Sequence, residues 1–346
     1  MLMLLIAFGA MQLGRTLAPS VVIWLEKIAP FGDQLRRRTA ATLFAPCVAS
    51  RGLARYAIGT AKPSRPAPAP VHDTVRIRWF RRGHCGQTRS LGGAAMNTPS
   101  PDAIRAETIT ITGHGGDEIE AYRASPLAEG SRGGIVWIHH MPGYDRETKE
   151  FVRRLAVSGY HAVAPNLYSR EAPGAAPDDA AATVRAAGGV PDERLVGDVA
   201  GAVEHLRSLP GANGKFGVIG HCSGGRHAYL AACSLPFDAA VDCYGAFIVE
   251  DLPEGMPKAM QPILHLAPKL SCPLLGLFGA DDRFPAPPAV ATLDAELTKF
   301  DKPHEFHSYE GAGHSFFSVD RPAYRPEAAV DGWRRIDEFF ATHLKG

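Results

Sequence analysis

The segment at residues 220–225, with the sequence GHCSGG, constrains the fold of this chain more than any other stretch. An apolar run at residues 215–219 precedes it, and helix-forming residues follow it at 226–232. A strand, a sharp turn and a helix in this order form the context of a G-x-nucleophile-x-G turn, here with Cys222 in the nucleophile position. The glycines let strand and helix approach closely, and the helix directs free N–H groups at the turn. The pattern therefore predicts a reactive thiolate at Cys222.

Apolar runs that alternate with amphipathic segments follow one another along the second half of the chain. The runs are typical of strands buried on both faces of a parallel sheet. They predict a doubly wound, mostly parallel α/β sheet, which binds ligands beyond the carboxyl ends of its strands. The predicted elements are an edge hairpin over residues 107–122, strands at 134–138, 161–165, 215–219, 239–243 and 273–278, and helices near 151–158, 191–206 and 326–343.

Two segments do not fit the alternation of strands and helices. Residues 171–191 are rich in Ala, Gly and Pro and predict a loop with a weak helix. Residues 251–269 predict an insertion over the edge of the sheet. Both segments bear on the shape of the pocket, and the sequence places neither of them.

A thiol at its ordinary pKa is mostly protonated at neutral pH, so Cys222 needs a base. In α/β-hydrolases the chain order is nucleophile, acid, base. Asp281 follows a late apolar strand, and His314 lies in a Gly-containing loop before the last helix. We therefore predict a catalytic triad of Cys222, Asp281 and His314.

Several alternatives to this triad stay open at the level of sequence. An aspartate after a strand is often a turn or N-cap residue, and Asp282 competes with Asp281 for the role of the acid. His221 and His139 are alternatives to His314, since the chain has 14 histidines. Cys222 itself has a structural alternative as a small core residue, because most cysteines are buried.

Four short segments together resemble the dienelactone hydrolase family. They are GHCSGG at 220–225, GAD at 279–281, AGHSF at 312–316 and NLY at 166–168. The resemblance extends from about residue 107 to the C-terminus. It implies a single-domain α/β-hydrolase fold without a metal or other cofactor, acting on a small-molecule ester or lactone.

The resemblance also implies a role for each matching residue. Cys222 attacks the ester carbonyl, His314 transfers the proton, and Asp281 orients the imidazole. The backbone N–H groups of Ser223 and Met141 form the oxyanion hole.

The sequence departs from the family pattern at two positions that bear on the substrate. Members that cleave dienelactone carry a Glu near the resting thiol, where this chain has His140, and an Arg four residues after the catalytic His, where it has Ser318. Arg226 and Arg283 are candidates for a replacement cation, although each also suits a structural ion pair. The resemblance therefore supports the hydrolase chemistry more strongly than it supports a particular substrate.

The first 95 residues differ in composition from the rest. They contain 14 Lys and Arg against 3 Asp and Glu, whereas the remaining residues contain 23 against 33. The apolar run at residues 1–11 is shorter than the ~20 residues that span a bilayer, and no positive region precedes it. We predict a basic, poorly ordered extension over 1–95 and a catalytic domain over 96–346. A membrane-tethering segment over residues 1–29 and a nucleic-acid-binding tail are the alternatives.

The six cysteines form no C-x-x-C pair and have no zinc-ligand spacing with His. We expect a reducing, cytoplasmic environment and no metal, nucleic-acid partner or stable membrane span. The leading prediction is a carboxylic ester hydrolase that forms an acyl-thioenzyme. A thioesterase or acyl-transfer enzyme on the same triad and a non-catalytic ligand-binding homologue are the alternatives, and the sequence predicts no oligomeric state.

Overall fold

The computed structural model describes residues 100, 102–254 and 259–345. The predicted extension over 1–95 and its boundary with the catalytic domain lie outside the described residues. The strands are β1 (Ile104–Thr112), β2 (Glu118–Pro126), β3 (Arg132–Ile138), β4 (His161–Pro165), β5 (Ala212–His221), β6 (Ala239–Cys243), β7 (Leu274–Gly279) and β8 (His304–Tyr309). The helices are α3 (Arg146–Val157), α4 (Pro177–Ala186), α5 (Asp192–Arg207), α6 (Ser223–Ser234), α7 (Pro287–Lys299) and α8 (Pro326–Leu344), with short 3-10 turns η1 (His114–Gly116) and η2 (Leu264–Lys269).

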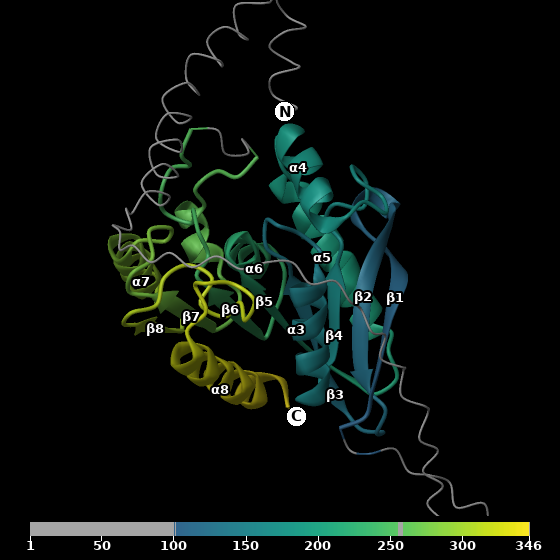
Figure 1. The fold of residues 1–346 in the computed structure, drawn as a ribbon. Coiled ribbons are helices and arrows are strands. Elements are labelled where there is room, and N and C mark those ends of the chain that lie inside the picture. Colours follow the sequence, from purple (N-terminus) through teal and green to yellow (C-terminus); the bar gives the residue numbers. More distant parts are fainter. Residues whose placement is uncertain (1–99, 101, 255–258, 346) are drawn as a thin grey trace, which may run out of the picture. The chain divides into compact units, whose positions relative to one another are not determined.

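The eight strands form one sheet in the order β1-β2-β4-β3-β5-β6-β7-β8, which runs from one edge to the other in Figure 1. The β1–β2 and β2–β4 pairs are antiparallel, and every later pair is parallel. The predicted edge hairpin and the mostly parallel sheet are therefore confirmed. Strand β5 lies in the middle of the parallel strands. Cys222 follows the carboxyl end of β5, and so it lies near the centre of the row of strand ends.

Alternate residues of the central strands pack against opposite layers of helices, as the two-residue period of a strand requires. In β3, Ile135 and Trp137 pack in a cluster with α3 and α8, whereas Val136 and Ile138 pack in a cluster with α4, α5, α6 and α7. Both clusters are buried, and this explains why the strands read as continuous apolar runs. The result is a sheet between two layers of helices.

Helix α4 lies within the Ala, Gly and Pro-rich segment 171–191, as predicted, and η2 lies within 251–269. The fold also contains α7 and β8, which were not predicted separately from the sequence. Among the described helices, none combines the length and hydropathy needed to cross a membrane.

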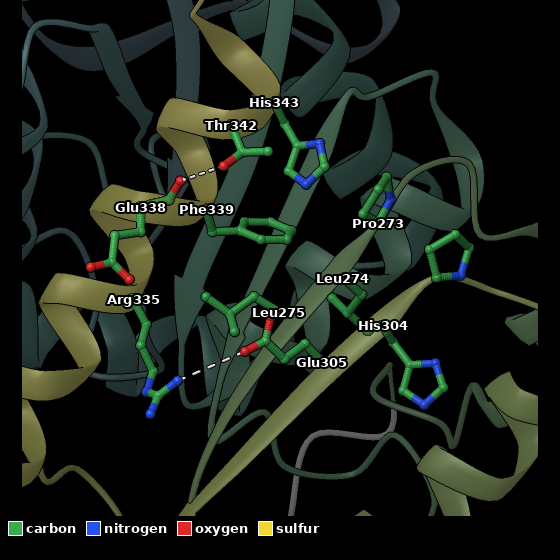
Figure 2. Close-up of a pocket in the computed structure, with 11 residues that line it drawn as sticks. Pro273, Leu274, Leu275, His304, Glu305, Arg335, Glu338, Phe339, Thr342 and His343 are labelled. Carbon is green, nitrogen blue, oxygen red and sulfur yellow. Dashed lines mark hydrogen bonds and ion pairs between the residues drawn. The ribbon is translucent and has the colours of Figure 1, made fainter.

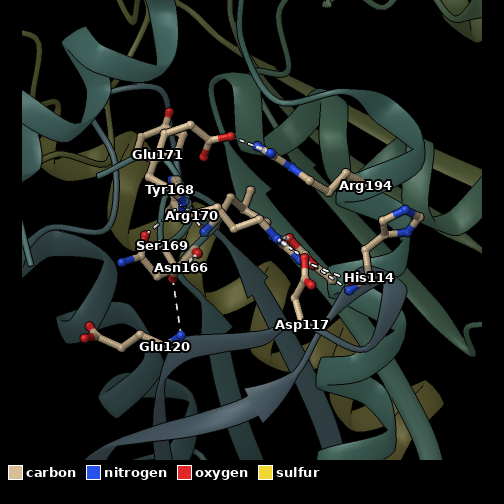
Figure 3. Close-up of polar contacts among 12 residues, drawn as sticks. His114, Asp117, Glu120, Asn166, Tyr168, Ser169, Arg170, Glu171 and Arg194 are labelled. Carbon is tan, nitrogen blue, oxygen red and sulfur yellow. Dashed lines mark hydrogen bonds and ion pairs between the residues drawn. The ribbon is translucent and has the colours of Figure 1, made fainter. Parts of the chain in front are cut away.

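An ion-pair network, with Asp198 buried and Asp117 exposed, holds the loop after β4. Arg170 contacts Asp117 at 2.7 Å and both carboxylate oxygens of Asp198 at 2.8 Å (Figure 3). Asp198 also accepts a hydrogen bond from the backbone N–H of His114 at 2.8 Å. The network joins the segment between β1 and β2, the loop after β4 and helix α5. It therefore holds in place the loop that contains Tyr168, a residue near the active site.

Candidate active site

Cys222 lies between β5 and α6 in the strained turn that the sequence predicted. Its φ of 54° is in the left-handed region, and its backbone N–H donates to the carbonyl of Cys243 at 3.0 Å. A Cβ at Gly224 would lie 2.2 Å from the carbonyl oxygen of Ile138, so this position has room for glycine alone. The tight turn directs the sulfur toward the N-terminus of α6.

The imidazole of His314 pairs with Asp282 and not with Asp281. The Nδ1 atom of His314 lies 2.9 Å from Oδ2 of Asp282, whose other oxygen accepts the backbone N–H of Phe284 at 2.9 Å. Asp282 is buried, whereas the neighbouring Asp281 is exposed. The sequence-based choice of Asp281 as the partner of His314 is therefore corrected to Asp282, because the turn after β7 directs only the second aspartate inward.

Cys222 and His314 form a coupled pair. Burial disfavours the thiolate, but a hydrogen bond and the charge of His314 more than offset this effect and hold the Cys222 pKa below its usual value. Burial likewise disfavours the imidazolium, whereas hydrogen bonds to Asp282 and Cys222 raise the His314 pKa to about 10. Both shifts favour a thiolate–imidazolium pair at neutral pH.

A second histidine lies close to the turn that contains Cys222. His140 is buried, and its Nε2 atom lies 2.8 Å from Oδ2 of Asp145, the N-cap residue of α3. Burial opposes protonation of His140, but the hydrogen bond and charge of Asp145 raise its pKa. The charge of His140 in turn helps to lower the Cys222 pKa. His140 thus adds positive potential beside the thiol.

The two predicted oxyanion-hole residues flank Cys222. Met141 and Ser223 both line the cavity at the thiol, and the backbone N–H of Ser223 interacts with the sulfur. The hydroxyl of Tyr168 donates to the carbonyl of Met141 at 2.8 Å. Within the described ranges, the Met141 N–H has no acceptor in the protein. The arrangement leaves that N–H available to a developing oxyanion.

The comparisons with known proteins assign the family. The model of the Dienelactone hydrolase family matches residues 119–344, which is more than half of the chain. The chain belongs to the dienelactone hydrolase family. It is accordingly a carboxymethylenebutenolidase-like hydrolase with the α/β-hydrolase fold.

Relatives of known name support this assignment over most of their length. The carboxymethylenebutenolidase of Pseudomonas putida is 33% identical over 238 residues, which cover 67% of this chain and 94% of the relative. A candidate carboxymethylenebutenolidase of Escherichia coli K12 is 33% identical over 263 residues, covering 73% of this chain and 92% of the relative. The crystal structure of a candidate dienelactone hydrolase from Klebsiella pneumoniae is 29% identical and superposes with a TM-score of 0.62, covering 69% of this chain and 99% of that one.

The thiol of this dienelactone hydrolase family member opens into a cavity of about 620 Å³. Three arginines line it, of which Arg283 was a sequence-based candidate and Arg185 and Arg321 were not. The remaining lining residues are His140, Met141, Pro142, Cys222, Ser223, Ala246, Phe247, Pro253, Asp281, Asp282, Phe284, His314 and Ser315. The cavity therefore combines a nucleophile with positive charge.

Two residues that the sequence associated with substrate binding lie elsewhere. Arg226 is fully buried and forms a two-pronged ion pair with Asp192 at 2.9 and 3.0 Å. It does not line the cavity, so it is a structural residue and the pocket assignment is wrong. Ser318 is also buried and hydrogen-bonds to Glu147.

The alternative histidines have structural roles. The ring of His221 packs against Trp137 and Phe317, with ring centroids 4.7 and 5.1 Å away. His139 contacts the carbonyl of His140 at 2.9 Å through Nδ1 and accepts the backbone N–H of Leu167 at 3.2 Å through Nε2. Neither ring lines the cavity of Cys222, whereas His314 does.

One group of side chains has the composition of a metal site. Donor atoms of His140, Asp145 and Glu147 lie within 4.8 Å of one another. However, the His140 nitrogen that faces the group is already bound to Asp145, and Glu147 is bound to Ser318. The Oε1 atom of Glu147 is buried without a hydrogen-bond partner among the described residues, whereas His140 and Asp145 are already paired with each other.

A further cavity, of about 380 Å³, lies between α8 and the amino ends of β7 and β8 (Figure 2). Leu274 and His304, the first residues of the two strands, line it together with Phe339 of α8. Ligands of parallel sheets bind at the carboxyl ends of strands, where Cys222 is found. This second cavity is therefore separate from the site.

Proposed function

We propose that this protein hydrolyses a small, anionic ester or lactone through an acyl-thioenzyme on Cys222. The supporting observation is that Cys222 lies in a nucleophile turn and shares its cavity with His314, which lowers the pKa of the thiol and is itself held by Asp282. Nucleophile, base and orienting carboxylate thus follow one another in contact, as triad chemistry requires.

In the first half-reaction, the Cys222 thiolate attacks the carbonyl carbon of the ester. The carbonyl electron pair moves onto oxygen, and the N–H groups of Ser223 and Met141 stabilise the oxyanion. When the tetrahedral adduct collapses, the C–O bond breaks and the leaving alkoxide takes the proton of the His314 imidazolium. The products are an acyl-thioester on Cys222, a free alcohol and neutral His314.

In the second half-reaction, neutral His314 takes a proton from water as the water oxygen attacks the thioester. The second tetrahedral adduct expels the Cys222 thiolate and releases the carboxylic acid, which ionises in solution. The thiolate–imidazolium pair is restored. Asp282 supports the positive charge of His314 at the start and end of the cycle.

The charge of the cavity supports an anionic substrate. Arg185, Arg283 and Arg321 all line it, and ion pairs of these three with carboxylates are absent from the part of the chain that the structure describes. Guanidinium groups bind carboxylates in a two-pronged geometry. We therefore expect a carboxylate on the substrate, held by these arginines in place of the cation lost at Ser318.

The test is a Cys222→Ala variant, with Cys233→Ala as the matched control on the same helix. We expect Cys222→Ala to lose measurable turnover of p-nitrophenyl esters and lactones while it keeps its folded circular dichroism spectrum, and Cys233→Ala to keep turnover. Retained activity in folded Cys222→Ala would contradict the proposal. A kcat/KM for acyl-thioesters well above that for esters and lactones would instead indicate a thioesterase.

A further inference from the structure

A buried histidine of α6 has no hydrogen-bond partner among the residues that the structure describes. His227 is 7% exposed, and neither of its ring nitrogens forms a hydrogen bond within the described residues. The ring faces a small cavity of about 20 Å³. Its other walls include His139, Met141, Tyr168, Arg185 and Ser223.

The polar neighbours of His227 do not satisfy it. Both nitrogens of His139 are bound to backbone groups, and the Tyr168 hydroxyl donates to Met141. Burial, followed by the charge of Arg226, holds the His227 pKa well below its usual value, so the ring is neutral. A neutral imidazole has one donor and one acceptor, and burying either without a partner is destabilising. An unpaired group of this kind indicates a missing ligand or water.

The small cavity adjoins the catalytic one. Met141, Arg185 and Ser223 line both cavities. His227 follows Ser223 by four residues in α6, so the two side chains lie on one face of the helix, about 5–6 Å apart at Cβ. The ring of His227 therefore lies one helical turn from Ser223, beside the cavity into which the thiol opens.

We propose that this cavity is a specificity subsite in which His227 binds a hydroxyl group on the acyl portion of the substrate. The two ring nitrogens point in diverging directions, so one small group in this cavity can pair with only one of them. A hydroxyl both donates and accepts, and so it can pair with that nitrogen in either tautomer of the neutral imidazole, whereas a carbonyl can only accept. The volume admits one group of the size of a water molecule. The inference deepens the proposed function and rests on it for the orientation of the acyl group.

The first test compares matched substrates. Two pairs of p-nitrophenyl esters differ by a hydroxyl against a methyl group: 3-hydroxybutyrate with 3-methylbutyrate, and 6-hydroxyhexanoate with heptanoate. In at least one pair, we expect His227→Phe to lower the hydroxyl-to-methyl ratio of kcat/KM by about tenfold, which corresponds to one hydrogen bond. His227→Gln, which keeps a donor and an acceptor, should retain most of the ratio.

A second test does not depend on turnover. The free acids of the same pairs are titrated calorimetrically into Cys222→Ala and into Cys222→Ala/His227→Phe, with the same expected loss of preference. If the wild type hydrolyses none of the esters, the proposed function fails, and the calorimetric ratio still decides the subsite. A ratio that changes less than about twofold in every pair and in both assays overturns the subsite, and leaves His227 with an internal water.

Discussion

Oδ2 of Asp282 lies 2.9 Å from Nδ1 of His314, while the adjacent Asp281 is exposed to solvent. The carboxylate that orients a catalytic imidazole fixes its tautomer and supports its positive charge. We therefore expect Asp282→Asn to lower kcat/KM by about 100-fold or more, because an amide at this position favours the wrong tautomer.

Asp281→Asn is the matched control for this variant, since it changes the same charge one residue away. We expect its kcat/KM to stay within about threefold of the wild type. Steady-state assays on one p-nitrophenyl ester compare the two. A larger loss in Asp281→Asn than in Asp282→Asn would assign the acid to Asp281.

The thiolate of Cys222 should be detectable by its reactivity with iodoacetamide. Because its pKa is below the ordinary thiol value of 9.0, the rate should reach half of its maximum below that pH. His140→Gln removes a positive charge beside the sulfur and should move the same pH profile upward. Site-resolved mass spectrometry gives the rates, with Cys233 and Cys272 as internal controls whose pKa burial raises to about 12.

An unlabelled Cys222 at neutral pH would contradict the thiolate and favour a non-catalytic protein of the same fold. If the pH profile is unchanged in His140→Gln, His314 and the helix alone lower the pKa of Cys222.

The arginines of the cavity should determine the charge preference. Arg185→Gln and Arg321→Gln are expected to raise KM for an ester with a distal carboxylate by about tenfold, with a smaller effect on its neutral methyl ester. Arg207→Gln, on an exposed part of α5, is the control. If the loss is equal for the charged and neutral esters, the arginines act on folding or cavity shape and not on substrate charge.

Asp242 links stability to pH. It is fully buried, its Oδ1 accepts the backbone N–H of Gly245 at 2.7 Å, and burial raises its pKa from 3.8 to about 7. The folded protein thus holds this proton more tightly than the unfolded chain, so ionisation costs stability as the pH rises between these values.

We therefore expect the free energy of unfolding of Asp242→Asn to increase relative to the wild type, by on the order of a few kcal/mol, between about pH 4 and pH 8. Urea unfolding of both proteins at each pH measures this change. Any effect of the substitution that does not depend on pH cancels when the two pH values are compared. A difference that is independent of pH would show that Asp242 does not titrate in this range.

The backbone at the nucleophile turn should tolerate no side chain at Gly224. Because an added Cβ would lie 2.2 Å from the carbonyl of Ile138, Gly224→Ala should lower the free energy of unfolding by about 3 kcal/mol or more. At Gly313 the nearest atom to an added Cβ is 3.6 Å away, so Gly313→Ala should stay within about 1 kcal/mol of the wild type. Urea unfolding of the two variants tests the contrast, which equal destabilisation would contradict.

The sequence predicted the fold where the physical signal was strong. The strands buried on both faces appear as apolar runs, and α8 appears as a helical period with Trp333 and Ile336 buried. There was no such signal for β8, whose sequence HEFHSY is polar because the strand lies at the sheet edge, where two of its six residues are exposed and none is buried. Helix α7 was missed as well, since two prolines at its start resemble a loop.

The details of the site depend on geometry that sequence spacing does not carry. Two aspartates follow β7, and which of them points inward is decided by the backbone of one turn. Arg185 reaches the cavity from segment 171–191, which the sequence could not place, and Arg321 reaches it from the loop after His314, for which there was no pocket prediction. The position of His227 near the site could have been predicted, because it follows Ser223 by four residues on one helix.

The three arginines of the cavity come from parts of the chain outside the sheet: Arg185 from α4, and Arg283 and Arg321 from loops. The sulfur and its turn, in contrast, are locked between two central strands by the backbone bond to Cys243. Selection can therefore change the substrate preference of this protein by altering peripheral segments, while the turn that holds Cys222 stays unchanged. Grafting those segments between relatives is accordingly a direct route to new specificities on one inherited scaffold.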